Sequence, residues 1–154
     1  MKNKIILILI TVTGILCVSK SEQISEVTSG IEWFQNNNSF WSSCIRITAS
    51  DGFVIIIDPV AVDTGIKADL ILITHSHNDH FSRYTVQELL KEDTVVIATE
   101  DCIIPDVDII TTAPGDINTV GNIEITSVPA YMGNEHKKEF GWIGYILDIS
   151  GTKV

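Results

Sequence analysis

Residues 70–80 read Leu-Ile-Leu-Ile-Thr-His-Ser-His-Asn-Asp-His, so an apolar run ends abruptly in three histidines and one aspartate. The run of leucine and isoleucine predicts a short, buried β-strand. Because side chains alternate between faces in an extended backbone, His75 and His77 point to the same side. Two imidazole groups on one side, just past the end of a strand, can bind one metal ion.

Asp79 and His80 follow as the chain turns away from this strand, where they can reach a second ion beside the first. Three of the four histidines of the chain lie in this stretch. Neutral imidazole together with carboxylate suits zinc, and also manganese or iron(II). The alternative is a solvated loop without a ligand role. We predict a metal site on His75, His77, Asp79 and His80, because ligand-type residues are so concentrated at one strand end.

Short β-branched runs bounded by Gly, Pro, Asn or Asp recur along the chain and predict further strands. We expect strands at residues 31–34, 44–49, 53–57, 70–74, 94–98, 108–111, 117–120, 123–128 and 143–149. Asp-Gly at 51–52, Gly-Asn at 121–122 and Ser-Gly at 150–151 predict hairpin turns. Residues 152–154 then begin a returning strand.

One helix is predicted after the histidine stretch, with Ser82 as its N-cap. Its predicted apolar face consists of Tyr84, Val86, Leu89 and Leu90. With the strands at 70–74 and 94–98, this helix forms a β-loop-α-β unit. Early hairpins followed by such a unit predict an α+β fold with a mixed sheet covered by helices.

The composition limits the class of protein. A length of 154 residues suits one domain, and 45% hydrophobic residues can form a buried core. The net charge of −10 argues against nonspecific binding of nucleic acid, which requires a positive surface.

The N-terminus resembles a targeting segment. Lys2 and Lys4 precede the apolar run 5–18, which is shorter than the ~20 residues of a membrane-spanning helix. We predict a cleaved signal peptide at residues 1–21, a mature domain at 22–154 and a secreted or periplasmic location. The alternatives are an uncleaved anchor or a lipoprotein modified at Cys17. Cleavage removes three lysines and makes the net charge −13.

Cysteine and tryptophan residues carry weaker signals. Export permits a disulfide between Cys44 and Cys102, but we favour two small buried apolar residues. The tryptophans at 33, 41 and 142 could line a pocket, although packing in a core or at its rim is more common.

Thr-His-x-His-x-Asp-His after an apolar strand resembles the signature of the metallo-β-lactamase superfamily. Phe-Val-Ile-Ile-Ile-Asp-Pro at 53–59 resembles the strand before that signature. Ser-Val-Pro-Ala-Tyr at 127–131, His136, and Gly-Trp-Ile-Gly-Tyr at 141–145 resemble the segment with a third metal histidine. The branch most resembled is that of the ascorbate-6-phosphate-lactonase-like hydrolases. The resemblance covers residues 31–154 and implies an αββα sandwich, largely its N-terminal half.

The resemblance also implies roles for single residues. His75, His77 and His136 would hold the first ion, while Asp79 and His80 would contribute to the second, with one or two zinc ions in all. A metal-bound hydroxide would attack the substrate, and Asp79 would orient it. His136 lies in a polar loop, so a solvated surface histidine is the alternative. Asp58 would steady the histidine loop or, alternatively, cap local backbone N–H groups.

This chain departs from the family pattern at its C-terminus. A complete member has a further strand that ends in an aspartate bridging both metals, and a later histidine on the second metal. The chain ends at Val154 before either, so we expect the natural protein to extend further.

Two functions follow as hypotheses. The first is a metal-dependent hydrolase of a small molecule, of the lactone, ester or phosphodiester class. The second is a noncatalytic metal-binding fragment or interaction domain of the same fold. Processing of nucleic acid is disfavoured by the negative charge.

Overall fold

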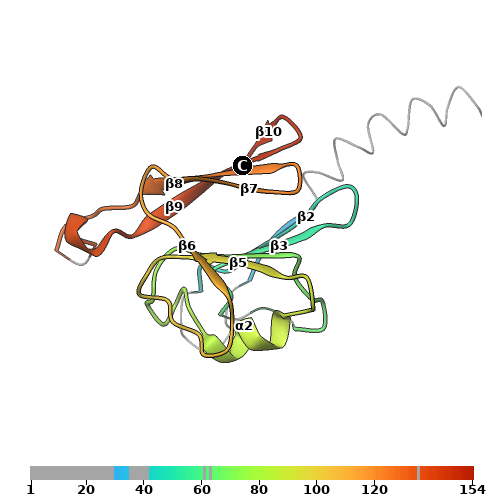
Figure 1. Cartoon of the computed structure of the whole chain (residues 1–154), viewed down its shortest axis with the longest axis horizontal. Coiled ribbons are helices and arrows are strands. Elements are labelled where there is room, and N and C mark those ends of the chain that lie inside the picture. The colour runs from blue at the N-terminus through green and yellow to red at the C-terminus, as the bar shows by residue number, and fades with distance from the viewer. Residues whose placement is uncertain (1–29, 35–41, 61, 63, 135) are drawn as a thin grey trace, which may run out of the picture.

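The computed structural model describes residues 30–34, 42–60, 62, 64–134 and 136–154. They form two β-sheets packed face to face, with one helix on the outer face of the larger sheet (Figure 1). The predicted signal peptide at 1–21 and the tryptophan at 41 lie outside the described residues. Within the described ranges, no helix has the length and apolar character needed to cross a membrane.

The larger sheet has six strands in the order of the sequence. They are β1 (Ile31–Trp33), β2 (Ile45–Thr48), β3 (Val54–Ile57), β4 (Leu70–Ile73), β5 (Val95–Ala98) and β6 (Ile109–Thr111). β1 to β3 pair antiparallel, whereas β3 to β6 pair parallel. The carboxyl ends of β3, β4 and β5 therefore meet at one edge, which is where the histidine stretch begins.

The smaller sheet is antiparallel throughout. It has the order β10 (Thr152–Lys153), β9 (Ile143–Ile149), β8 (Ile123–Pro129) and β7 (Ile117–Val120). A short 3₁₀ helix, η1 (Lys138–Phe140), lies between β8 and β9. All nine predicted strands are present, and the returning strand after residue 151 is β10.

The predicted hairpin turns are also present. Gly52, Gly121 and Gly151 have φ values of 87°, 60° and 87°. This left-handed conformation favours glycine, so the turn residues explain why the strands reverse where they do.

The helix α2 (Arg83–Leu89) begins as predicted, since the Ser82 hydroxyl accepts the backbone N–H of Thr85 at 3.2 Å. The prediction that Tyr84 belongs to its apolar face is wrong, because this side chain is 71% exposed. Residues 84 and 86 are about 200° apart around a helix, and Val86 is the one that is buried.

The centre of the larger sheet is buried on both faces. Ile71 and Ile73 of β4 belong to the apolar cluster under α2, whereas Leu70 and Leu72 belong to the cluster between the two sheets. All four side chains have no exposed surface. A strand with two buried faces explains the unbroken apolar run and gives the histidine stretch a rigid base.

Cys44 and Cys102 are both buried and do not form a disulfide bond, in agreement with the favoured interpretation. Burial raises the pKa of the Cys102 thiol to about 12, which keeps it protonated at neutral pH.

Asp69, directly before β4, bonds to the start of β3 and to Lys91 after α2. Its carboxylate accepts the backbone N–H of Val54 at 2.8 Å and forms an ion pair with Lys91. Burial alone would raise the pKa of Asp69, but these hydrogen bonds and the Lys91 charge lower it overall. Its stabilising effect is therefore present above the unfolded pKa of about 3.9 and is lost as pH falls through the lower folded pKa.

We predict that Asp69→Asn lowers the free energy of unfolding by about 1 kcal/mol at pH 7. The difference from the unmodified chain should shrink below about pH 4, because the Asp69 carboxyl group then takes up a proton first in the unfolded chain and, at lower pH, in the native chain as well. Urea denaturation at pH 7 and at pH 3 measures both values. An equal difference at the two pH values would contradict the assignment.

Tyr145 links the two sheets. From β9 its hydroxyl group points at the ends of β4 and β5, 3.0 Å from the Ile73 carbonyl oxygen and 3.3 Å from the Ile97 carbonyl oxygen. Burial strongly raises the pKa of this phenol, so it stays a hydrogen-bond donor.

We predict that Tyr145→Phe costs about 1 kcal/mol of stability, the typical value of one such bond. Metal binding should persist, because the aromatic ring still fills the space. Urea denaturation combined with metal analysis tests this, and a loss of metal without a loss of stability would contradict it.

Candidate metal centre

Three histidine side chains gather at the edge where β4 ends. One ligand atom from each of His75, His77 and His136 lies within 4.8 Å of the other two. His75 and His77 come from the turn after β4, and His136 comes from the β8–β9 connection. There the His136 backbone exchanges two hydrogen bonds with Met132, at 3.0 and 3.1 Å. The structure thus brings together the three residues that were expected to share the first ion.

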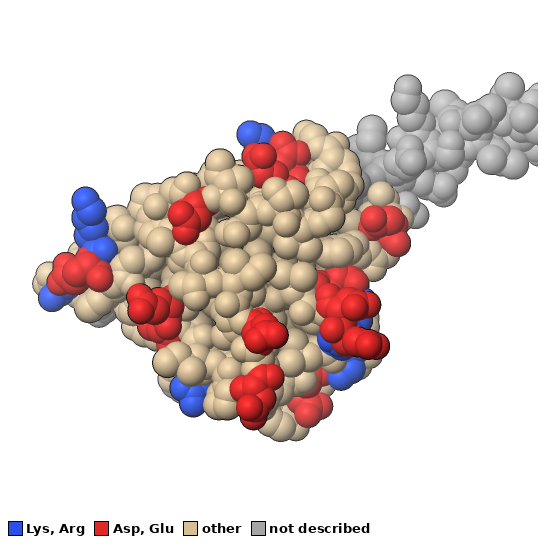
Figure 2. All heavy atoms as spheres, viewed as in Figure 1, with Lys and Arg blue, Asp and Glu red and all other residues tan. Residues whose placement is uncertain are grey.

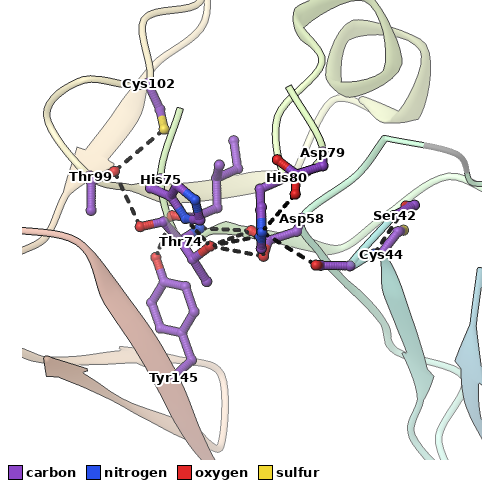
Figure 3. A network of polar contacts seen from close by, with 12 residues as sticks. Ser42, Cys44, Asp58, Thr74, His75, Asp79, His80, Thr99, Cys102 and Tyr145 are labelled. Atoms are coloured by element: carbon purple, nitrogen blue, oxygen red, sulfur yellow. Dashed lines mark hydrogen bonds and ion pairs between the residues drawn. The ribbon is translucent and has the colours of Figure 1, made fainter. Parts of the chain in front are cut away.

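Thr74 determines which ring nitrogen of His75 carries the hydrogen (Figure 3). Its hydroxyl oxygen lies 2.8 Å and 3.0 Å from the two carboxylate oxygens of Asp58, and 2.9 Å from Nδ1 of His75. A hydroxyl group has one hydrogen and a carboxylate can only accept. Thr74 therefore donates to Asp58 and accepts the Nδ1–H of His75, which leaves a lone pair on Nε2.

The Nε2 atom of His75 is well suited to bind a metal ion. The residue is only 3% exposed, and within the described part of the chain this nitrogen has no hydrogen-bond partner. An unpaired buried acceptor costs about 1–3 kcal/mol, which a metal ion would offset. Burial, with the neighbouring His80, His77 and His136, lowers the pKa of His75 to about 4. At neutral pH the imidazole is thus in the uncharged form that metals bind.

Asp58 supports this centre from the end of β3. Its carboxylate accepts the backbone N–H of Thr74 at 2.8 Å and binds Nδ1 of His80 at 2.7 Å. The residue is buried and adopts a φ of 50°, a conformation uncommon for residues other than glycine. Asp58 thus takes the first of its two expected roles, because both the N–H and the ring nitrogen that it binds belong to the histidine stretch rather than to its own turn.

His80 and Asp79 form a second pair beside the three histidines, and the centroid of the His80 ring lies 4.1 Å from that of His75. Nε2 of His80 lies 3.6 Å from a carboxylate oxygen of Asp79 and 3.3 Å from the Ser43 hydroxyl. Burial lowers the pKa of His80, but the hydrogen bond and charge of Asp58 raise it overall. Since Asp58 holds Nδ1, only Nε2 could serve a second ion. Ser43 was not predicted, because a lone serine before a strand carries no sequence signal.

Trp142 and Asp101 complete the surroundings of the histidines. Trp142 is buried, as expected of a packed residue, but it packs against the histidine rings. Its indole N–H donates to Asp101 at 2.9 Å. Asp101 was not predicted, because it follows β5 in a loop without a motif. Trp33, by contrast, is 62% exposed.

A two-sheet sandwich with a cluster of histidines at one sheet edge defines a metal-binding fold. Comparison with known families agrees with this class: residues 38–154 match the beta-lactamase superfamily domain. The chain belongs to the metallo-β-lactamase superfamily. The predicted fold class is thereby confirmed.

Solved structures show the same fold. A protein of Parabacteroides distasonis, provisionally assigned as a metal-dependent hydrolase, is 32% identical with a TM-score of 0.63. The match covers 71% of this chain and 54% of that one. Igni18, a metallo hydrolase of Ignicoccus hospitalis, is 18% identical with a TM-score of 0.57, covering 80% and 57%. This chain thus matches about half the length of both structures. No curated protein sequence matches the chain.

A third structure, the diiron β-hydroxylase CmlA of Streptomyces venezuelae, is 16% identical with a TM-score of 0.52. The match covers 68% of this chain and 25% of that protein. At this identity the likeness concerns the fold alone. Its name shows that the fold is also found in an iron enzyme.

Proposed function

We propose that the protein is a metal-dependent hydrolase in which His75, His77 and His136 bind the first metal ion. The observation that carries the proposal is the buried Nε2 atom of His75, which has no hydrogen-bond partner among the described residues and lies beside two other histidines. Membership in the superfamily and the likeness to the Parabacteroides protein support it.

A zinc ion held there would lower the pKa of a bound water and polarise the bond under attack, and manganese or iron(II) would be alternatives. The chain's own residues prepare the centre. Thr74 holds His75 and Asp58 holds His80. Asp79, with a side chain 39% exposed and close to His80, can reach incoming solvent. We assign Asp79 the roles of orienting the attacking water and, with His80, contributing to a second ion.

The proposed substrate is a small molecule with a lactone, ester or phosphodiester bond, in line with the resemblance to the ascorbate-6-phosphate-lactonase-like branch. Nucleic acid is not an expected substrate. Acidic side chains are spread over the face shown in Figure 2, and the basic ones lie mostly at its margins. We further propose export through a signal peptide at 1–21, with membrane association only where that segment is uncleaved or lipidated.

One observation favours the alternative of a noncatalytic metal-binding fragment or interaction domain. Among the described residues, the converging ligand atoms come from His75, His77 and His136, whereas the His80 ring only packs against His75. Asp79 and His80 alone are few ligands for a tight second site. The chain also spans about half the length of the solved structures that it matches.

Hydrolysis assays separate the two functions. The chain, loaded with zinc or manganese, is tested on lactones, carboxylic esters and phosphodiesters. Turnover that disappears with a chelator and in Asp79→Asn supports the hydrolase. Metal retention without turnover on any substrate supports the noncatalytic alternative.

A further inference from the structure

The three histidines are restrained unequally. His75 is held through the Thr74 hydroxyl. For the rings of His77 and His136, the described part of the chain offers ring contacts but no hydrogen bond. His77 is exposed and His136 half-buried. Because imidazole rings that lack a hydrogen bond and reach solvent change rotamer readily, the packing of neighbouring rings must keep these two facing one site.

Trp142 is in contact with all three rings. The distance between ring centroids is 4.7 Å to His75, 4.4 Å to His77 and 4.9 Å to His136. The indole is only 7% exposed. An indole N–H can donate a hydrogen bond but offers no lone pair to a metal, so Trp142 can shape the centre without being a ligand.

Asp101 fixes the orientation of this indole. Its carboxylate accepts the Trp142 Nε1–H at 2.9 Å, the Thr99 hydroxyl at 2.6 Å and the backbone N–H of Ser76 at 3.3 Å. Ser76 separates His75 from His77 in the sequence. One carboxylate thus connects the end of β5, the histidine turn and the start of β9, three segments that surround the site.

We propose that Asp101 is a positioning residue that acts through Trp142, holding His77 and His136 in the arrangement that binds metal. This inference rests on the proposed function, because Asp101 can have this positioning role only if the three histidines bind a metal ion. Asp101 contacts neither the histidine ring nitrogens nor the expected ion. Residues that orient ligands in this way typically change metal affinity about 10- to 100-fold when replaced.

The first test is a cobalt(II) titration, followed by the visible absorption of the bound ion. Asp101→Asn should weaken cobalt binding about tenfold and change the shape of the absorption band. Glu100→Gln is the matched control, since it removes one negative charge at the neighbouring exposed position and should leave both readouts unchanged. An effect of Asp101→Asn no larger than that of the control would overturn the proposal.

A double-mutant cycle with Trp142→Phe tests whether the effect passes through the indole. If it does, Asp101→Asn should weaken binding far less in the Trp142→Phe background than in the unmodified chain. An undiminished effect would mean that Asp101 acts through Ser76 and would contradict our assignment.

A metal-free measurement separates this inference from the proposed function. In the apo protein, NMR should show contacts from the Trp142 indole protons to the His77 and His136 rings, and Asp101→Asn should weaken them. Contacts that persist unchanged in Asp101→Asn would overturn the positioning role. Absence of cobalt binding by the unmodified chain would instead overturn the proposed function.

Discussion

The His75→Ala variant is expected to lose at least ~100-fold in affinity for zinc. His75 is the buried member of the histidine cluster, and its Nε2 atom has a lone pair with no partner within the described residues. Removing it leaves two partly exposed histidines, which bind a metal ion weakly. Isothermal titration of the metal-free protein with zinc measures the change.

Asn78→Ala is the matched control, because Asn78 is an exposed residue of the same turn. It should bind zinc with the affinity of the unmodified chain. His77→Ala and His136→Ala should each behave like His75→Ala. Unaltered zinc affinity in His75→Ala would contradict the assignment of this centre.

The Asp58→Ala variant is expected to lose about 3 kcal/mol of stability, because it removes several hydrogen bonds to a buried carboxylate, each of which contributes about 1.5–3 kcal/mol. Without the carboxylate, the backbone N–H of Thr74 and Nδ1 of His80 lose their partner. The unpaired Thr74 hydroxyl is then free to donate to His75, so zinc affinity should fall as well. Urea denaturation and zinc titration measure the two effects.

Asp106→Ala provides a matched control for backbone strain. Asp106 has a φ of 61°, close to the 50° of Asp58, but it is exposed. Both substitutions place alanine in the left-handed region, so the difference between them reports the carboxylate network. A loss of stability in Asp58→Ala no larger than in Asp106→Ala would show that this network contributes nothing.

The strands could be predicted from the sequence because their signals are local. Short β-branched runs, glycine turns and a serine N-cap each act within a few residues, and the resulting elements are present. The error at Tyr84 has the same origin. An aromatic residue near other apolar residues was assigned to the buried face, although helical periodicity puts it on the opposite side from Val86.

The site was only partly predictable. The spacing of His75 and His77 on an extended segment is enough to place both rings on one side. Asp101 and Trp142, however, are separated by 41 positions, and their bond depends on how β9 is placed beside the ends of β4 and β5. A sequence pattern carries no information on such long-range placement.

The orientation of the His80 ring, which packs against His75 with its centroid 4.1 Å away, was equally hidden. In the sequence His80 is one of a group, but its partner Asp58 is separated by 22 positions and lies at the end of the parallel neighbour β3. That carboxylate turns the His80 ring toward Ser43 and Asp79. The pairing of parallel strands, which brings Asp58 beside His80, thus determines where Nε2 of this histidine points.

The most direct test of the central claim is the metal content of the purified chain after exhaustive dialysis, measured by elemental analysis. We predict about one retained zinc, manganese or iron ion per chain, held by His75, His77 and His136. A chain that is folded, but retains no ion and takes none up when zinc is added, would contradict the account.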